Sequence, residues 1–183
     1  MSKPNHQVED PRLGLLRARV RDIPDFPKPG ILFRDLTPLM ADGAALQHAV
    51  ALLAERLGPH RPEAILAVES RGFIFGAPVA AALGIGFVPV RKPGKLPHKT
   101  ARRDYALEYG TDALEMHADA IVSGARVALV DDLLATGGTA GATIELVREL
   151  GGSVVVAAFV VELAFLEGRP RLGAQSTESL IVY

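Results

Sequence analysis

The chain has 183 residues, enough for one domain with a substantial core, and its 20 basic and 21 acidic residues leave a net charge of −1. This balance gives no support for nucleic acid as the main partner, and the absence of cysteine excludes disulfides and thiolate metal sites. The longest apolar run, Val154 to Val161, is far shorter than the roughly 20 residues that cross a bilayer, and residues 1–10 lack the apolar stretch of a signal peptide. We therefore expect a cytoplasmic protein with no nucleic acid and no membrane as partner.

The first third of the chain predicts two helices with an irregular segment between them. A short helix should end near Asp22. Residues Ile23 to Gly30 contain three prolines and should be extended, because proline fixes φ and removes a backbone donor. Helical spacing of apolar residues then runs from Ala44 to Leu57, and Gly58 is a typical stop.

Short apolar runs in the rest of the chain predict buried strands: Ala64–Val68, Phe87–Val90, Val127–Val130 and Val154–Val161, with Ser179–Tyr183 as a further edge strand. Because they alternate with helical patterns, the fold class should be α/β, with a mostly parallel central sheet flanked by helices. Ligands of such open sheets bind beyond the carboxyl ends of the strands.

A basic segment and a hairpin are predicted in the middle of the chain. Residues 92–104 carry two prolines, a glycine and five basic residues, which indicates a flexible loop of the kind that often serves as a lid. Weak alternation over Tyr105 to Tyr109, followed by Gly110, predicts a hairpin whose return strand is Ala113 to Met116.

Residues Val127 to Thr139 are the most informative about function. Four apolar residues are followed by two carboxylates, Asp131 and Asp132, where the strand should end. A turn of small residues comes next, Ala135-Thr136-Gly137-Gly138-Thr139, and a helical pattern begins after it. Unpaired backbone N–H groups at a helix N-terminus favour an anion, and glycines let a phosphate approach closely. Ionised carboxylates accept hydrogen bonds from vicinal ribose hydroxyls.

This combination predicts a site for a phosphorylated sugar. The simpler alternative is an ordinary strand–helix loop with an acidic strand end. A Walker A loop is excluded because no Gly-x-x-x-x-Gly-Lys-Ser/Thr occurs, and no Gly-x-Gly-x-x-Gly follows a strand. The five histidines show no ligand spacing, so we expect no metal site made by the protein alone.

The run from 127 to 139 resembles the phosphoribosyl-pyrophosphate (PRPP) signature of the type I phosphoribosyltransferase family. Other motifs extend the resemblance, over about residues 23–161, to the adenine branch of that family: DFPKPGILFRD (Asp25–Asp35), ESRGF (Glu69–Phe73), RKPGKLP (Arg91–Pro97) and LEYG (Leu107–Gly110).

The resemblance implies a single phosphoribosyltransferase domain over 1–183, with a small base-binding hood at about 23–37 and the flexible loop at about 92–104. It implies transfer of the 5-phosphoribosyl group from PRPP to N9 of adenine, which gives AMP and pyrophosphate in purine salvage. Mg²⁺ is expected on the phosphates of PRPP and on water rather than on protein ligands. A homodimer is also implied.

The resemblance further assigns roles to residues that match the family motifs. PRPP would be bound by the carboxylates Asp131 and Asp132, by the turn Ala135, Thr136, Gly137, Gly138 and Thr139, and by Ser70 and Arg71 at the pyrophosphate. Arg91 and Lys95 would supply catalytic cations, with Arg91 reaching the site of a neighbouring subunit. Without the family, Ser70-Arg71 would be a simple turn and the basic residues a solvated loop.

The adenine pocket would consist of Ile31, Leu32, Phe33 and Arg34, closed by Leu163; the bottom-up alternative is that the apolar members are plain core. Glu108 would carry or share a proton at adenine N7, and Tyr109 would cover the ribose or close the lid. Two rival functions stay open: the same chemistry on another base (hypoxanthine, guanine, xanthine or a pyrimidine), and a PRPP-sensing regulator on the same fold.

Overall fold

The computed structural model describes residues 10–106 and 111–183, which divide into two compact units, Met1–His48 and Ala49–Tyr183. Among the residues described, none of the helices combines the length and the apolar character that crossing a membrane requires. The single domain over 1–183 stays a prediction.

The N-terminal unit holds a short helix, a two-stranded antiparallel sheet and a second short helix. Helix α1 (Pro11–Arg17) is followed by β1 (Arg21–Pro24), which pairs with β2 (Leu32–Asp35). The turn between these strands contains a cis Phe26–Pro27 peptide bond and is closed by a 2.8 Å hydrogen bond from the Gly30 N–H to Asp25. Helix α2 (Thr37–Ala41) comes next, and α3 (Gly43–Leu57) runs past the end of the unit.

A five-stranded parallel sheet forms the centre of the larger unit. Its strands are β3 (Ala64–Val68), β4 (Gly86–Val90), β7 (Arg126–Leu134), β8 (Ser153–Glu162) and β9 (Ser176–Val182), in the spatial order β4-β3-β7-β8-β9. The chain leaves β3 toward one edge and β7 toward the other. The strand order therefore reverses between β3 and β7, which is where open α/β sheets bind ligands.

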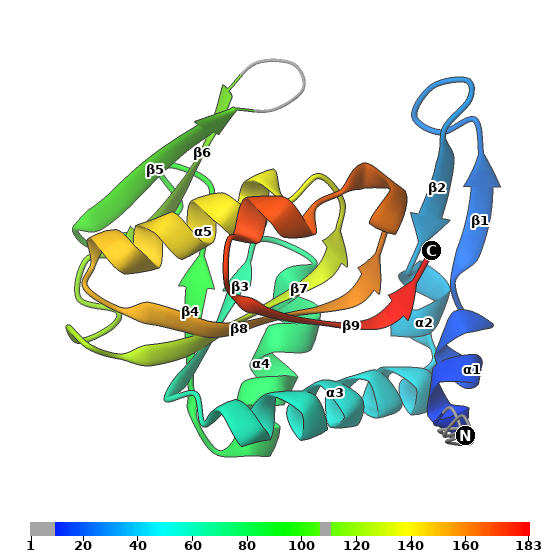
Figure 1. Cartoon of the computed structure of the whole chain (residues 1–183), viewed down its shortest axis with the longest axis horizontal. Coiled ribbons are helices and arrows are strands. Elements are labelled where there is room, and N and C mark those ends of the chain that lie inside the picture. Colours follow the sequence, from blue (N-terminus) through cyan, green and yellow to red (C-terminus); the bar gives the residue numbers. More distant parts are fainter. Residues whose placement is uncertain (1–9, 107–110) are drawn as a thin grey trace, which may run out of the picture. The chain divides into compact units, whose positions relative to one another are not determined.

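Helices cover the sheet, and an antiparallel hairpin packs beside one of them (Figure 1). Helix α4 (Gly72–Leu83) connects β3 to β4, and α5 (Gly138–Glu149) connects β7 to β8 on the opposite face. The hairpin strands β5 (Thr100–Ala106) and β6 (Thr111–His117) lie next to α5. Short 3₁₀ turns complete the unit: η1 (Gly58–His60), η2 (Ala164–Leu166) and η3 (Arg169–Leu172).

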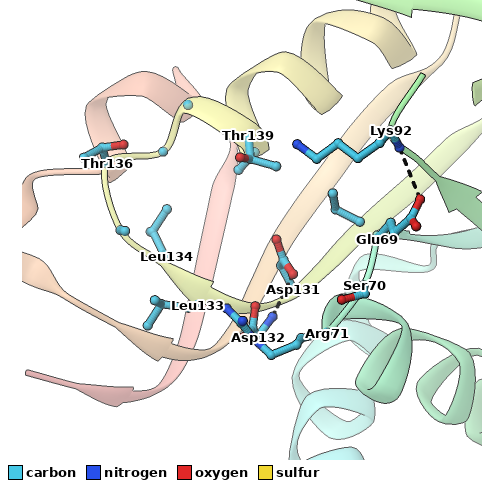
Figure 2. Close-up of a pocket in the computed structure, with 15 residues that line it drawn as sticks. Glu69, Ser70, Arg71, Lys92, Asp131, Asp132, Leu133, Leu134, Thr136 and Thr139 are labelled. Carbon is cyan, nitrogen blue, oxygen red and sulfur yellow. Dashed lines mark hydrogen bonds and ion pairs between the residues drawn. The ribbon is translucent and has the colours of Figure 1, made fainter. Parts of the chain in front are cut away.

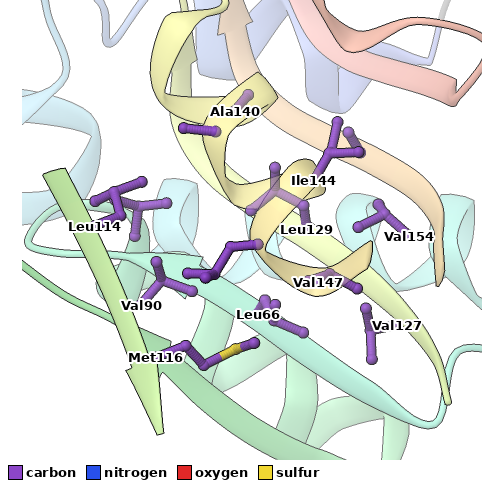
Figure 3. Packing of buried hydrophobic residues seen from close by; sticks show 14 of the residues in the cluster. Leu66, Val90, Leu114, Met116, Val127, Leu129, Ala140, Ile144, Val147 and Val154 are labelled. Carbon is purple, nitrogen blue, oxygen red and sulfur yellow. The ribbon is translucent and has the colours of Figure 1, made fainter. Parts of the chain in front are cut away.

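The main hydrophobic core lies between the sheet, α5 and the hairpin (Figure 3). Strand residues such as Leu66 and Leu129 meet Ile144 and Val147 of α5 and Met116 of β6, and all of them are at least 96% buried. Alternation along a strand sends the neighbouring side chains to the other face. There Gly76 of α4 lies so close to β3 that an added Cβ would be 2.5 Å from Cβ of Ala67. Tight packing on both faces fixes the ends of β3 and β7.

Most of the predicted strands and helices are present in the structure but differ in extent, and the segment Ile23–Gly30, predicted as irregular, contributes Ile23 and Pro24 to strand β1. The α/β fold class is confirmed, the strand Ala64–Val68 has the predicted bounds, and the edge strand at the C-terminus exists as β9. The prediction that the strand ends at Asp131 is wrong, since β7 continues to Leu134 and stays paired with β8. The first helix ends at Arg17 rather than near Asp22.

The loop predicted over 92–104 ends earlier than expected, and its flexibility stays a prediction. Residues from Thr100 onward belong to β5, which pairs with β6 from Thr100 opposite His117 to Ala106 opposite Thr111. Backbone pairing of this kind makes an extended strand out of a polar sequence that carries little apolar signal. The predicted return strand Ala113–Met116 is confirmed as the middle of β6.

Candidate functional site

A cavity of about 310 Å³ opens at the carboxyl ends of β3 and β7, where the strand order reverses (Figure 2). This volume lies within the range of small-molecule sites. The lining comes from the end of β3 with the loop after it, from one lysine, and from a continuous stretch of β7 and α5: Val68–Arg71, Lys92 and Asp131–Ala140. The carboxylate pair, the small-residue turn and the Ser70-Arg71 loop, all of which the resemblance assigns to PRPP, therefore lie around one cavity.

The turn between β7 and α5 presents a helix N-terminus to this cavity. Gly137 occupies the N-cap position with φ of 79°, a left-handed conformation that favours glycine, and it has no side chain with which to cap the helix. The first backbone N–H groups of α5 are therefore available to an anion. Thr136 and Thr139 line the cavity and can add hydroxyl donors.

Gly168, the residue before η3, packs against the turn formed by residues 135–139, which we call the glycine turn. A Cβ added to Gly168 would lie 2.2 Å from the carbonyl oxygen of Ala135, and one added to Gly137 would lie 2.4 Å from the carbonyl oxygen of Gly168. Arg169 next to Gly168 is held by Glu162, with guanidinium–carboxylate distances of 2.7 and 2.6 Å. The backbone of the turn thus rests directly on the backbone of a segment in which the sequence shows no chemical motif.

The carboxylate of Asp131 lies against the first residue of α4. A Cβ added to Gly72 would be 2.6 Å from Oδ1 of Asp131, so that only glycine leaves room for the carboxylate. The same Oδ1 accepts a 2.9 Å hydrogen bond from the backbone N–H of Asp132. Burial, together with the negative charge of Asp132, raises the pKa of Asp131 well above its ordinary value. Any group that donates hydrogen bonds or carries positive charge here would favour the ionised form.

The neighbouring carboxylate already has a cationic partner. Asp132 is buried and forms an ion pair with Nε of Arg71, whose side chain is 52% exposed. The peptide bond between Glu69 and Ser70, just before this arginine, is cis. Arg71 therefore links the loop after β3 to the acidic pair on β7 through its ion pair with Asp132.

Arg91 follows β4 and forms a bidentate ion pair with Glu69. The distances are 2.9 Å from Nε and 3.0 Å from Nη2 to the two carboxylate oxygens, and Nη1 donates a 3.0 Å hydrogen bond to the carbonyl oxygen of Lys95. This hydrogen bonding to Arg91 lowers the pKa of Glu69 below its ordinary value. Arg91 and Lys95 do not line the cavity described above, and their predicted catalytic role stays a prediction.

Lys92 lines the cavity and was not among the residues that the sequence singled out. Figure 2 shows its side chain reaching toward Thr139 on the far side of the cavity. Its ammonium forms an ion pair with Asp112 and donates a 3.1 Å hydrogen bond to the hydroxyl of Tyr105. In the sequence Lys92 is one of five basic residues in a loop, and only the tertiary structure distinguishes it.

The residues predicted to bind adenine belong to both units. Ile31 precedes β2, and Leu32, Phe33 and Arg34 lie on it; the Leu32 side chain is 45% exposed, while Phe33 contacts Phe26 edge-to-face at 5.2 Å. Leu163, at the end of β8, is buried in the larger unit and donates a 2.9 Å backbone hydrogen bond to Leu134. Their role in base binding stays a prediction.

Two predicted site residues, Glu108 and Tyr109, lie outside the described residues. Within residues 10–106 and 111–183, no three histidine or carboxylate side chains gather as metal ligands would. Mg²⁺ on the phosphates of PRPP stays a prediction.

Comparisons with known proteins match this architecture. A family model for the phosphoribosyl transferase domain matches residues 38–176. The adenine phosphoribosyltransferase of Desulfitobacterium hafniense is 57% identical over 164 residues, which cover 90% of this chain and 95% of the relative. That of Thermotoga petrophila is 54% identical over 168 residues, covering 92% and 99%.

A solved structure of adenine phosphoribosyltransferase from Thermoanaerobacter pseudethanolicus superposes with a TM-score of 0.90 at 51% identity, over 93% of this chain and 99% of that one. The yeast enzyme, crystallised with adenine and D-2,5-dideoxy-2,5-imino-altritol 1,6-bisphosphate, gives 0.89 at 39% identity, over 93% and 98%. The chain therefore belongs to the phosphoribosyltransferase family, and within it to the adenine phosphoribosyltransferases.

The raised pKa of Asp131 predicts a specific dependence of stability on pH. A folded-state pKa above the unfolded value of about 3.9 means that the folded chain binds more protons, so the free energy of unfolding falls as pH rises through the folded-state pKa. Asp131→Asn cannot ionise and should escape this loss. Its Tm should match wild type near pH 4 and exceed it at pH 8, in a domain of a size for which each 1 kcal/mol corresponds to roughly 2–4 °C.

Thermal unfolding between pH 4 and pH 8 measures this difference, with Glu167→Gln as the control because Glu167 is an exposed carboxylate far from the acidic pair in the sequence. The control should follow wild type at every pH. An Asp131→Asn variant that does the same would show that Asp131 is not destabilised in its ionised form.

Proposed function

We propose that this chain is a pentosyltransferase that moves the 5-phosphoribosyl group of PRPP to N9 of adenine, giving AMP and pyrophosphate for purine salvage. The observation that carries the proposal is a single cavity in which the carboxylates of β7 stand beside the uncapped N-terminus of α5. The relatives named above support adenine as the base.

The 5′-phosphate of PRPP binds at the glycine turn. Backbone N–H groups of residues 136–139 and the hydroxyls of Thr136 and Thr139 supply its donors, and the dipole of the twelve-residue α5 favours the negative charge. The rigid support of Gly137 by Gly168 means that these donors need not be ordered when the phosphate arrives.

The ribose hydroxyls are bound by Asp131 and Asp132 as acceptors. A ligand with two vicinal hydroxyls gives Asp131 the donors that its ionised form needs, and Asp132 beside it forms an ion pair with Arg71. Mg²⁺ enters as part of the substrate, bound to the phosphates of PRPP and to water, as this ion prefers. Mg²⁺ bound in this way would supply positive charge beside the pyrophosphate.

The pyrophosphate lies toward the loop after β3. Ser70, Arg71 and Lys92 line that side of the cavity and provide its donors. Arg91 and Lys95 add positive charge, and Arg91 acts on the site of a neighbouring subunit in a homodimer. The electrostatic logic is that of an anion-stabilising site, in which fixed cations lower the energy of the charge that develops on the leaving group.

The bond between C1′ and the pyrophosphate oxygen breaks as N9 of adenine bonds to C1′, and the proton of N9 is released. Adenine is held by Ile31, Leu32, Phe33 and Arg34 of the N-terminal unit, and Leu163 closes the slot. Glu108 carries or shares a proton at N7, which prepares N9 for attack, and Tyr109 covers the ribose. A cytoplasmic location completes the proposal.

The direct test is product formation. The purified chain, mixed with adenine, PRPP and Mg²⁺, should form AMP and pyrophosphate in equal amounts, as measured by chromatography. Parallel reactions with hypoxanthine, guanine and uracil should give less than about a hundredth of that rate, because a site built for the 6-amino edge leaves polar groups unpaired with a 6-oxo base. Omitting Mg²⁺ should abolish turnover.

Each other outcome has a definite meaning. Turnover of hypoxanthine in place of adenine would replace the assignment of the base and keep that of PRPP. Binding of PRPP without turnover of any base would contradict the enzyme and favour a regulator on the same fold.

The role of Glu108 predicts a separation of binding from chemistry. Glu108→Gln keeps the size of the side chain and loses its proton-carrying function, so kcat should fall by about 10²–10⁴-fold while the Kd for PRPP stays unchanged. Steady-state kinetics and calorimetric titration measure the two quantities. Glu149→Gln, at an exposed position on the surface, is the control and should leave both unchanged. An unchanged kcat in Glu108→Gln would remove Glu108 from the chemistry.

A further inference from the structure

The hydroxyl of Tyr105 joins three elements that meet beside the cavity, although Tyr105 does not line the cavity itself. It accepts a 3.1 Å hydrogen bond from the ammonium of Lys92, which follows β4. It donates a 3.2 Å hydrogen bond to Oδ2 of Asp112 on β6. It also lies 3.3 Å from the hydroxyl of Thr139 in the first turn of α5.

These contacts use the full hydrogen-bonding capacity of a phenol. A tyrosine hydroxyl has one proton to donate and two lone pairs that accept. The proton goes to Asp112, which as a carboxylate can only accept. One lone pair accepts from Lys92, whose ammonium can only donate, and the second is left for Thr139. The arrangement therefore has one consistent direction for each hydrogen bond.

The surroundings hold this arrangement in place. The Tyr105 ring packs against the main hydrophobic core, and the ammonium of Lys92 lies 5.6 Å from the ring centroid. Asp112 is fixed by a 2.8 Å hydrogen bond from the backbone N–H of Ala113. Burial alone would lower the pKa of Lys92, but its hydrogen bonds to Asp112 and Tyr105 raise that pKa above its ordinary value, so Lys92 remains a cation.

We infer that Tyr105 is a positioning residue for PRPP: its hydroxyl holds the Lys92 ammonium beside Thr139, where the cation meets a phosphate group of the substrate. This inference rests on the proposed function. A lysine side chain has a flexible four-carbon stem, and ordering it during binding costs entropy. Because Tyr105 already holds the Lys92 side chain in the folded protein, less entropy is lost when PRPP binds. A phenylalanine would keep the ring packing and the cation–ring contact, and it would lose the hydroxyl that hydrogen-bonds to Lys92 and lies 3.3 Å from Thr139.

A double-mutant cycle tests whether Tyr105 acts through Lys92. We would titrate Mg–PRPP into wild type, Tyr105→Phe, Lys92→Met and the double variant, and measure Kd by calorimetry. Tyr105→Phe should weaken binding by about three- to tenfold, the range expected for one lost hydrogen bond. In the Lys92→Met background the same substitution should change Kd by less than about twofold, since contacting residues are not additive. The KM for adenine at saturating PRPP should not change.

Tyr183→Phe is the control, because it removes a tyrosine hydroxyl from a residue that does not line the cavity; it should bind Mg–PRPP as wild type does. A Tyr105→Phe variant with wild-type Kd would overturn the inference, and so would an equal loss with and without Lys92. Wild type that binds Mg–PRPP but makes no AMP from adenine would overturn the proposed function alone, and wild type that does not bind Mg–PRPP would overturn both.

Discussion

The pairing of β3 with β7 is the constraint on which the site depends. The chain leaves these neighbouring strands toward opposite edges of the sheet, so the loops that follow them diverge and a cavity opens between them. The two sides can approach closely only because Gly72 begins α4, where any side chain would collide with the Asp131 carboxylate. Gly168 likewise has no side chain that would collide with the backbone of the glycine turn. Close backbone packing thus sets the positions of the donors and acceptors before any ligand arrives.

The charged side chains around the cavity are arranged in pairs. Three cations near the cavity are each paired with a carboxylate: Arg71 with Asp132, Arg91 with Glu69, and Lys92 with Asp112. In every pair the cation is the more exposed member, with 52% against 8%, 32% against 20% and 38% against 30% of the side chain exposed. A polyanionic substrate in the cavity therefore meets Arg71 and Lys92, the two of these cations that line it, in positions already fixed by their carboxylate partners.

Much of this fold could be predicted because burial leaves a signal in the sequence. Ala64–Val68 is buried on both faces and appears as a continuous apolar run, so its bounds were predictable. The last residues of β7 gave no such signal, because Asp131 faces the cavity while its backbone stays paired with β8. Thr100–Arg103 belong to a strand whose side chains are largely polar, and only pairing with β6 makes it regular.

The candidate site also contains parts that the sequence predicts and parts that only the tertiary structure shows. The carboxylate pair and the glycine turn are local motifs whose chemistry can be inferred from adjacent residues, whereas the role of the Ser70-Arg71 loop was predicted only from the family resemblance. Lys92 differs from the other basic residues of its loop by lining the cavity and by its contacts with Tyr105 and Asp112 on two other strands, which no local pattern of the sequence predicts. The support that Gly168 gives to the glycine turn is likewise a contact between segments far apart in the sequence.

The central claim is that the acidic pair on β7 and the turn after it form the PRPP site. The most direct measurement is a calorimetric titration of Mg–PRPP into wild type and into the double variant Asp131→Asn with Asp132→Asn, each first shown by circular dichroism to be folded. Losing two carboxylate contacts to the ribose should weaken binding by at least about tenfold. A double variant that binds Mg–PRPP with wild-type affinity would contradict the account.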